Sequence, residues 1–499
     1  MQLMPIFLPT VFIVLLLLDY LMNLTKKTAI QIVNEMGSGY NLGHSFDSYL
    51  YSKKINIPND AITLLRNPIP TKKLIVNIKK YGFKTIRFPV TWIYFIDQYG
   101  NINPEWILRV KEVVKWIIEK KLYCILNVYT DTDVWIRDIE SKNKYINLWK
   151  QIAEEFKDFN EYLLFESMND PIFLNKNYEY NYDILVNFTQ SFVNTIRNSG
   201  RYNKERLLII SGMNSNFALT CSEKYKMPID PVNKLAISIN YYIPEEFTKN
   251  KEFWNSYDKW GSQEDYKELL QNFVKLRNFY VNKGIPVVIG EVGVITEEKK
   301  EISSIREYLY SVFSLASEYE GIMACLWDTS NKNFGNMNYY NRLTDEWYDD
   351  KIKNIYMKIS KGQFVKSSDF YIYSNIETLI DIEQYSDYFI TLGTKKPLKI
   401  ILNIYYSGML FYDYYFEIYC LDISKWEIFI DYDERNGKKQ YDGTITYTID
   451  ISNRNCIEFF EIYYYYGEIY FKNITIEYQE NFSSFYYNGF KAKIVSEIN

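Results

Sequence analysis

The 499-residue sequence is poor in the residues that most often bind metals. It contains one histidine, His44, and five cysteines, none of which form a C-x-x-C pair. Zinc and haem sites need clustered histidines and cysteines, so the composition argues against both. Cys124 and Cys325 lie in apolar runs and are expected in the core. Cys420 and Cys456 are candidates for a disulfide, which the sequence alone does not decide.

The chain also lacks an excess of basic residues. Its formal net charge is −5 at pH 7. Nucleic acids and anionic membrane surfaces select for basic faces, so neither is an expected partner. Aromatic residues are abundant instead, with 49 Tyr, 31 Phe and 10 Trp. Such rings suit stacking on sugars, but AT-biased codon usage also enriches Tyr, Ile, Asn and Lys, and is the preferred explanation.

The N-terminal segment is the one long apolar run. From about residue 3 to residue 18 it is almost entirely apolar, which is short for a spanning helix of about 20 residues and typical of a signal peptide. No positive segment precedes it and no A-x-A site follows, so a signal anchor is the alternative for residues 1–24. Either way we expect export, with a secreted protein unless the segment anchors it to a membrane.

Short β-branched runs alternate with helical patterns between about residues 35 and 330. Most runs are continuously apolar, as strands buried on both faces require. Eight such units predict an α/β fold of the (β/α)₈ TIM barrel type over residues 28–362. No glycine-rich phosphate turn follows the first strand, which argues against a dinucleotide site. The predicted strands are Tyr40–Gly43, Thr85–Val90, Tyr123–Tyr129, Tyr162–Met168, Leu207–Ser211, Leu235–Asn240, Pro286–Glu291 and Ile322–Trp327.

The pattern changes after about Ser367. Short alternating runs separated by polar and glycine-containing turns predict a β-sandwich module over residues 367–499. The module is rich in Tyr, so it is either a carbohydrate-binding module or a packed appendage. Its clearest strands are predicted at Lys399–Tyr406, Tyr414–Cys420, Trp426–Asp431 and Gly443–Ile449.

Polar residues stand at the ends of the predicted barrel strands, where active sites of this fold lie. Asp170 follows the fourth strand and Glu291 ends the seventh. Two carboxylates facing each other across the mouth of a barrel could serve as the pair that glycoside hydrolysis requires. The other candidates at strand ends are Arg87, Asn169, Asn240, Tyr242 and Trp327.

Several motifs in the right order give a specific resemblance over residues 28 to 357. They are GSGYNLGHSFDSY, NIKKYGFKTIRFPVTW, PEWILRVKEVVKWIIEKKLYCILNVY, LLFESMNDP, SINYYIP, KGIPVVIGEVG, LWDTS and NRLTDEWYDD. The chain resembles glycoside hydrolase family 5, of the endo-β-1,4-glucanase type. The resemblance implies a β-glucan substrate, and we expect a monomer that needs no cofactor.

The resemblance also implies roles for individual residues. Glu291 matches the nucleophile, and Asp170 occupies the acid/base position. Asn169 matches the residue that binds the sugar 2-hydroxyl. Arg87 and Tyr242 match the residues that hydrogen-bond the nucleophile and keep it ionised. Trp327 matches the aromatic floor under the sugar in the −1 subsite.

The chain departs from the family at five residues. Asp170 replaces a Glu, and its carboxyl is therefore retracted by up to about 1.5 Å, one C–C bond. Tyr129-Thr130 replaces a pair of histidines, and Asn240 replaces another. His44 stands where the family usually has Asn, and we interpret it as a loop residue with its hydrogen bonds satisfied.

Three hypotheses remain. The first is a secreted retaining endo-β-1,4-glucanase, impaired by a degenerate site. The second is a catalytically inactive protein that binds β-glucan. The third is a glycosidase of shifted specificity, such as a mannanase or xyloglucanase.

Overall fold

The computed structural model describes most of the first 366 residues and the backbone of nine strands beyond them. The described ranges are 27–48, 58–129, 139–171, 178–249, 258–296, 300–331 and 337–366, followed by strand segments between 386 and 488. The predicted segment 1–24, Thr130 and Cys456 lie outside them. The chain divides into two compact units, and all eight barrel strands and every candidate catalytic residue belong to the first.

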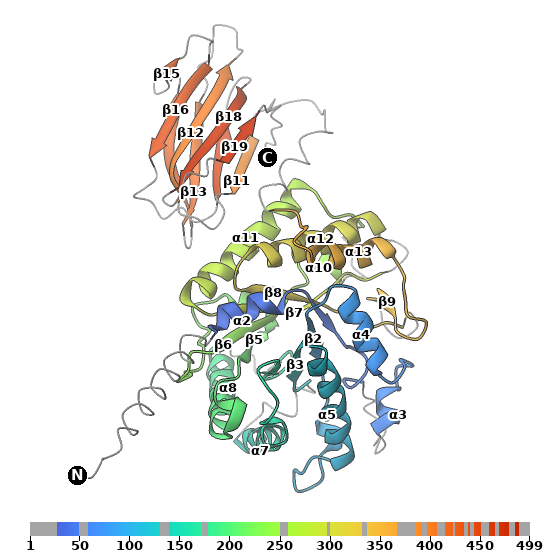
Figure 1. The fold of residues 1–499 in the computed structure, drawn as a ribbon. Coiled ribbons are helices and arrows are strands. Elements are labelled where there is room, and N and C mark those ends of the chain that lie inside the picture. Colours follow the sequence, from blue (N-terminus) through green and yellow to red (C-terminus); the bar gives the residue numbers. More distant parts are fainter. Residues whose placement is uncertain are drawn as a thin grey trace, which may run out of the picture. The chain divides into compact units, whose positions relative to one another are not determined.

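Eight parallel strands form a closed barrel in chain order, with β8 paired to β1 (Figure 1). The predicted barrel is confirmed, and each predicted strand overlaps an observed one. β6 has the predicted bounds. β5 runs five residues beyond its predicted end because its register against β6 shifts between Ser211 and Asn216. The strands are β1 (Gly39–Asn41), β2 (Thr85–Phe88), β3 (Tyr123–Asn127), β4 (Leu163–Glu166), β5 (Leu208–Asn216), β6 (Leu235–Asn240), β7 (Val287–Val292) and β8 (Ile322–Leu326).

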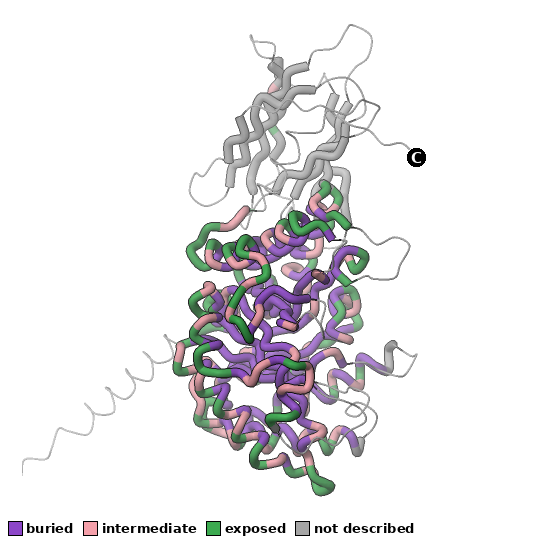
Figure 2. Tube along the Cα trace, turned by 90° about the vertical axis from the view of Figure 1, so that its right-hand side faces the viewer, coloured by how far each residue is buried: buried purple, intermediate pink, exposed green. Residues whose placement is uncertain are grey.

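Helices alternate with the strands, and local sequence accounts for their ends. α5 has Asn103 as its N-cap, whose side chain accepts from the amides of Glu105 and Trp106, and Pro104 occupies its first turn. Its apolar residues recur on one face, which is buried. In the part of the chain that the structure describes, buried residues gather in the interior and exposed ones lie on the outside (Figure 2). The main helices are α4 (Lys72–Lys80), α5 (Pro104–Glu119), α7 (Ile139–Phe156), α8 (Tyr178–Asn198), α11 (Gln263–Phe279), α12 (Ile302–Glu318) and α13 (Asp350–Ile359).

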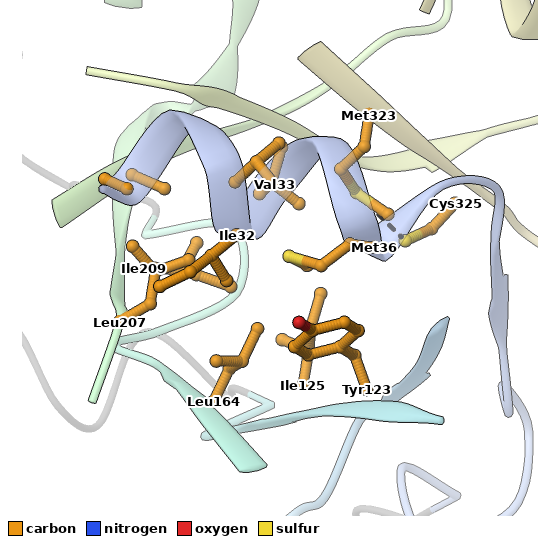
Figure 3. Close-up of a cluster of buried hydrophobic side chains, with 13 residues drawn as sticks. Ile32, Val33, Met36, Tyr123, Ile125, Leu164, Leu207, Ile209, Met323 and Cys325 are labelled. Carbon is orange, nitrogen blue, oxygen red and sulfur yellow. Dashed lines mark hydrogen bonds between the residues drawn. The ribbon is translucent and has the colours of Figure 1, made fainter. Parts of the chain in front are cut away.

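The N-terminal end of the barrel is closed by a short helix, α2 (Ala29–Met36). Thr28 caps this helix through a capping box with Gln31. The buried face of α2 joins a core cluster of residues that lie near the starts of the strands (Figure 3). Because this end is filled with apolar side chains, polar chemistry is confined to the opposite end. The cluster contains Ala29, Ile32, Val33, Met36, Tyr123, Ile125, Leu164, Leu207, Ile209, Ala236, Val288, Met323 and Cys325.

The C-terminal strands pair into two antiparallel sheets. Their orders are β11-β17-β13-β14 and β15-β16-β12-β18-β19. All four strands predicted there overlap observed ones. Face-to-face packing of the two sheets, which would make a sandwich, stays a prediction. The strands are β11 (Ser386–Thr391), β12 (Pro397–Tyr406), β13 (Tyr415–Asp422), β14 (Lys425–Asp433), β15 (Lys438–Lys439), β16 (Thr444–Asp450), β17 (Phe459–Tyr464), β18 (Ile469–Tyr478) and β19 (Phe485–Asn488).

Two further predictions concern the described residues. Cys124 and Cys325 are buried in the core, as expected, and Cys221 is buried too; all three are free thiols. In the part of the chain that the structure describes, none of the helices has both the length and the apolarity to cross a bilayer.

Candidate active site

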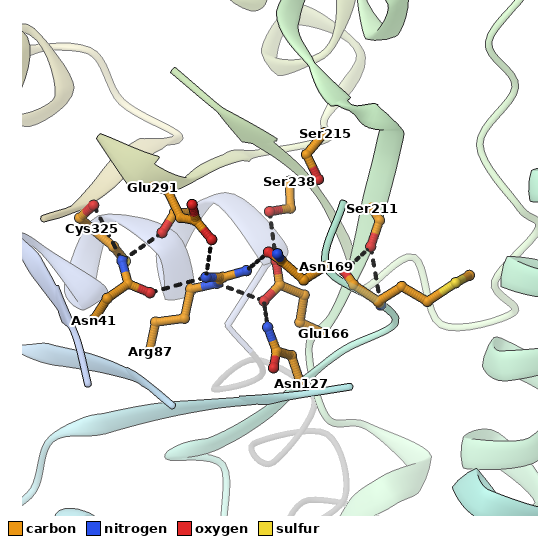
Figure 4. A network of polar contacts seen from close by, with 12 residues as sticks. Asn41, Arg87, Asn127, Glu166, Asn169, Ser211, Ser215, Ser238, Glu291 and Cys325 are labelled. Atoms are coloured by element: carbon orange, nitrogen blue, oxygen red, sulfur yellow. Dashed lines mark hydrogen bonds and ion pairs between the residues drawn. The ribbon is translucent and has the colours of Figure 1, made fainter. Parts of the chain in front are cut away.

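The candidate active site lies at the C-terminal end of the barrel, where six strands each place a polar residue at or next to their last position. These residues are Asn41, Arg87, Asn127, Glu166, Asn240 and Glu291. Inward-facing polar side chains in an apolar barrel must find partners among themselves, because unpaired buried polar groups are costly. The result is one connected hydrogen-bond network (Figure 4).

Arg87 is the hub of this network. Its side chain is fully buried, with Nε 2.7 Å from Glu166 and Nη1 3.1 Å from Glu291. Nη1 also donates to Asn41, and Nη2 donates to Asn169. Burial alone would disfavour the cation, but the charges of Glu166 and Glu291 outweigh it and raise the pKa of Arg87. Arg87 is therefore a permanent positive charge that is shared between two carboxylates.

Glu291 is held by a donor on each carboxylate oxygen. Oε1 accepts from Arg87, and Oε2 accepts from the hydroxyl of Tyr242 at 3.0 Å. Burial and the neighbouring charge of Asp170 nevertheless raise the pKa of Glu291 to about 7. Lys249 lies over the ring of Tyr242, with Nζ 4.4 Å from the centroid. Thus two of the predicted site residues, Arg87 and Tyr242, do meet at the carboxylate of Glu291.

Asp170 follows β4 and is held mainly by neutral groups. Its Oδ1 accepts from the amide of Asn240 at 2.8 Å, and its Oδ2 accepts from Asn169 at 3.2 Å. Burial raises its pKa as well. Because the charge of Asp170 contributes to the shift of Glu291, the two carboxyls titrate as a pair that keeps one proton up to near-neutral pH.

Three aromatic side chains stand together beside the carboxyl pair. The rings of Tyr129 and Trp327 are parallel, with centroids 6.3 Å apart, and His44 meets Trp327 edge-on. Gly43 lies against the same indole, because a Cβ there would come within 3.1 Å of the ring. Burial and the nearby charge of Glu291 raise the pKa of Tyr129, so its hydroxyl stays protonated. Tyr129 and Trp327, both predicted for the site, thus lie side by side.

The expectation for His44 needs a correction. Its backbone is well bonded: the amide donates to Asp47, and the carbonyl accepts from Asn67. Its Nδ1, however, is buried and has no hydrogen-bond partner among the described residues. Burial lowers the pKa of the imidazole, which favours the neutral form. His44 is thus a neutral ring against Trp327, and its side chain is not fully satisfied.

Sequence reasoning missed the role of Glu166. This residue is 1% exposed and accepts from Ser238 at 2.7 Å and from Asn127 at 3.1 Å, besides its ion pair with Arg87. A signal was present, since a Glu in the apolar run LLFE of a strand buried on both faces requires a partner. Glu166 therefore shares the positive charge of Arg87 with Glu291.

A second missed group fixes the loops around Trp327. Arg342 is buried, and its guanidinium donates to the carbonyls of Gly43 and Asp328 and to the hydroxyl of Tyr40. Tyr40 in turn donates to the carboxylate of Asp328. The loops after β1 and β8 are therefore joined through one cation, which places the indole of Trp327. Separations of about 300 residues hid the contacts of Arg342 with Tyr40 and Gly43 from local sequence patterns.

No group of three or more His, Cys, Asp or Glu side chains among the described residues is arranged to hold a metal ion. What the site does present is a pair of carboxyls, a shared cation and a group of aromatic rings. Two carboxyls at a barrel mouth with one proton between them can act as nucleophile and acid/base on a glycosidic bond.

Comparison with known proteins agrees with this chemistry. A solved structure described as a GH5-4 broad specificity endoglucanase from an uncultured bovine rumen ciliate is 47% identical. The match covers 67% of this chain and 99% of that one, with a TM-score of 0.65. A second, a GH5-4 broad specificity endoglucanase from Ruminococcus champanellensis with bound cellotriose, is 29% identical over 67% of this chain and 99% of that one, with a TM-score of 0.61.

Curated sequences and a family profile lead to the same assignment. Endoglucanase A of Clostridium longisporum is 33% identical over 348 residues, and the match spans 66% of this chain and 65% of that protein. The profile described as "Cellulase (glycosyl hydrolase family 5)" matches residues 51–333. This match covers more than half of the chain and includes every candidate catalytic residue. The chain therefore belongs to glycosyl hydrolase family 5.

Proposed function

We propose that this protein is a retaining endo-β-1,4-glucanase that cuts internal bonds of cellulose or a related β-glucan. The observation that carries the proposal is the position of Glu291, whose two oxygens accept from Arg87 and Tyr242, with Asp170 close enough to raise its pKa. The relative from Ruminococcus champanellensis carries cellotriose, a fragment of such a glucan.

The hydrogen-bond donors indicate which carboxyl of the pair acts as nucleophile and which as acid/base. Glu291 accepts from the guanidinium of Arg87, whose charge stabilises a carboxylate. The hydrogen bonds that Asp170 accepts from Asn169 and Asn240 come from neutral amides, and none of its hydrogen-bond donors among the described residues is a cation. The single proton of the pair therefore belongs on Asp170, which leaves Glu291 ionised and ready to act as the nucleophile.

In the first step, an oxygen of Glu291 attacks the anomeric carbon and forms a covalent bond to it. The bond from that carbon to the glycosidic oxygen breaks, and the departing oxygen takes the electron pair together with the proton of Asp170. In the second step, water attacks the anomeric carbon and gives a proton to Asp170. Glu291 leaves as a carboxylate, so the site returns to its starting state with the configuration retained.

Neighbouring groups are placed to bind the sugar during these steps. The Nδ2 of Asn169 is the donor we assign to the sugar 2-hydroxyl, because its Oδ1 is already engaged by Arg87. Trp327 is 8% exposed and provides a flat face for the sugar ring. Arg342 supports this face through the loops described above. No cofactor enters the scheme.

We further propose that turnover is slower than Glu at position 170 would allow. The side chain is shorter by one C–C bond, about 1.5 Å, and misplacement by about 1 Å can lower a rate on the order of 10²-fold. The same shortening favours a second candidate, a protein that binds β-glucan without cleaving it. A shifted specificity, towards xyloglucan or mannan, is the third.

Turnover on several polysaccharides tests these candidates. Purified full-length protein is assayed for reducing ends on carboxymethylcellulose, mixed-linkage β-glucan, xyloglucan and mannan, with Glu291→Ala as the inactive variant. Glu105→Ala, in the exposed first turn of α5, is the matched control. Release from the glucans that disappears only in Glu291→Ala supports the proposal. Glucan binding without release from any substrate would establish the second candidate.

The covalent step has its own test. A 2-deoxy-2-fluoro-β-cellobioside with a dinitrophenyl leaving group should add the mass of one 2-deoxy-2-fluorocellobiosyl group to the intact protein, with release of dinitrophenolate, and should leave Glu291→Gln unmodified. Inversion of configuration, observed by NMR of the first product, would contradict the retaining mechanism.

The remaining features of the chain are proposed on sequence grounds. We infer that the protein is secreted as a monomer, that residues 28–362 form the catalytic domain, and that the two C-terminal sheets pack as a carbohydrate-binding sandwich over 367–499. Loss of binding to insoluble cellulose in a chain ending at residue 366, with activity on soluble substrate kept, would support the binding role. Equal binding by both chains would argue for a packed appendage.

A further inference from the structure

The backbone around Asp170 is irregular on both of the strands that meet there. Asp170 has a φ of 37°, and Asn214 and Ser215 on β5 have φ values of 53° and 46°. Left-handed conformations are uncommon for residues other than glycine and persist only where surrounding contacts hold them. The irregular part of β5 lies within its register shift against β6. These two segments are therefore held in place by their mutual contacts.

One of these contacts joins the two irregular segments directly. The amide of Asp170 donates to the hydroxyl oxygen of Ser215 at 3.1 Å. Ser215 is 3% exposed, so solvent does not compete for this bond. Without the bulge in β5, the hydroxyl would point elsewhere, because successive strand residues alternate between faces. The bulge and the serine together determine the direction in which the Asp170 side chain leaves the backbone.

The carboxyl end of the same residue is held from β6. Asn240 donates from Nδ2 to Asp170 Oδ1 at 2.8 Å, and a second register shift, between β6 and β7, occurs at Asn240. The other end of this amide, Oδ1, is buried and has no hydrogen-bond partner among the described residues. Buried acceptors without partners are rare and destabilising. Stability alone therefore does not account for Asn at this position.

We propose that Ser215 and Asn240 are positioning residues that aim the short acid Asp170 at the glycosidic oxygen. Ser215 fixes the backbone of Asp170, and Asn240 fixes the orientation of its carboxyl group. Together they offset part of the reach that is lost with one methylene. This inference rests on the proposed glucanase function and deepens it by assigning a role to two residues that act only through Asp170.

The amide of Asn240 also suits both protonation states of the acid. It donates from Nδ2 while Asp170 is ionised, and after a half-turn it can accept through Oδ1 from the protonated acid. The half-turn breaks no other hydrogen bond of Oδ1 that the structure describes, since that atom has none. Asp170 gains and loses one proton in each catalytic cycle. The neutral amide of Asn240 can remain hydrogen-bonded to it in both states by exchanging donor for acceptor.

Substrates with different leaving groups separate this role from a structural one. Departure of 2,4-dinitrophenolate from its β-cellobioside needs little protonation, whereas departure of phenolate from phenyl β-cellobioside depends on the acid. We expect Ser215→Ala and Asn240→Ala to lower kcat/KM on the phenyl substrate by about 10- to 100-fold, the scale of a misplaced acid. On the dinitrophenyl substrate the loss should be below about threefold.

Two further variants serve as controls. Ser211→Ala removes another buried serine hydroxyl of β5, which bonds the backbone of Met168 instead of Asp170. It should lower the melting temperature and leave the ratio of the two kcat/KM values unchanged. Ser215→Gly keeps the left-handed backbone accessible but lacks the hydroxyl, so it should behave like Ser215→Ala if the hydroxyl carries the effect.

Two results would overturn the inference. Equal losses on both substrates would show that Ser215 and Asn240 only maintain the fold. No loss on either substrate, in folded variants, would show that neither residue acts on the acid. Failure of the proposed function looks different: the wild-type protein would then hydrolyse neither cellobioside and would not be labelled by the fluorinated inhibitor.

Discussion

Lengthening Asp170 by one methylene is the most direct perturbation of the proposed mechanism. Asp170→Glu moves the carboxyl outward by up to about 1.5 Å. General acid catalysis contributes roughly 10²- to 10⁴-fold, and a misplacement of about 1 Å can forfeit on the order of 10²-fold of it. We therefore expect kcat/KM on phenyl β-cellobioside to rise by about 10- to 100-fold, equivalent to about 1.4 to 2.7 kcal/mol.

The local backbone opposes this gain. Asp tolerates the left-handed region better than Glu does, so a glutamate at the φ of 37° should cost about 1 kcal/mol of stability. The hydrogen bond from Asn240, 2.8 Å long, must also be remade at a new position. A loss of about 1 kcal/mol in the free energy of unfolding lowers the melting temperature of a domain of about 150–250 residues by roughly 2–4 °C, and that of a larger domain by less. We therefore expect the melting temperature to fall by about 2 °C.

The assay combines steady-state kinetics on phenyl and dinitrophenyl β-cellobiosides with calorimetric melting of the same preparations. A gain confined to the phenyl substrate supports a retracted acid. A gain below about threefold in a folded variant would refute the claim that reach limits turnover, and would mean that Ser215 and Asn240 already place the carboxyl correctly. A gain of equal size on both substrates would place the effect outside acid catalysis.

Three other predictions follow from the network. The carboxyl pair keeps one proton to about pH 7, whereas a Glu in the unfolded chain loses its proton near pH 4.5. The free energy of unfolding should therefore fall by up to about 3 kcal/mol as the pH rises from 4.5 to 7. Urea unfolding at several pH values should show this fall in the wild-type protein and not in Glu291→Gln. Glu166→Ala removes one of the two carboxylates that pair with the buried Arg87. It should lower the free energy of unfolding, measured with denaturant, by about 3–5 kcal/mol. A loss below about 1 kcal/mol would contradict the shared ion pair. Trp327→Ala should weaken cellotriose binding at least about tenfold by calorimetry, or about 1.4 kcal/mol; unchanged affinity would exclude stacking.

Much of the barrel was predictable because burial on both faces leaves a plain signal. β3 and β8 are continuous apolar runs, and eight such runs separated by helices allow few topologies. The same rule locates the site, since strands that end together bring their last residues together. Arg87, Asp170 and Glu291 could therefore be singled out from their positions alone.

The rest depended on contacts that no local pattern encodes. Ser215 reaches Asp170 only because β5 bulges, and the run that contains it, MNSN, is rich in turn residues and therefore did not indicate a strand that continues to Asn216. Arg342 joins two loops, one of which lies about 300 residues away in the chain. Helix α2 precedes the first strand, so its place at the bottom of the barrel follows from tertiary packing and not from strand order.

The charges at the site influence which form of Asp170 starts the proposed cycle. Three carboxyls surround one buried cation, and Arg87 is shared between Glu166 and Glu291. A cationic imidazole beside Asp170 would lower the pKa of that carboxyl and promote loss of its proton. Asn240 is neutral, so its donated hydrogen bond opposes protonation of the carboxyl less than a cation at the same place would. A neutral amide at position 240 therefore favours a protonated Asp170 at the start of the proposed cycle more than a cation there would.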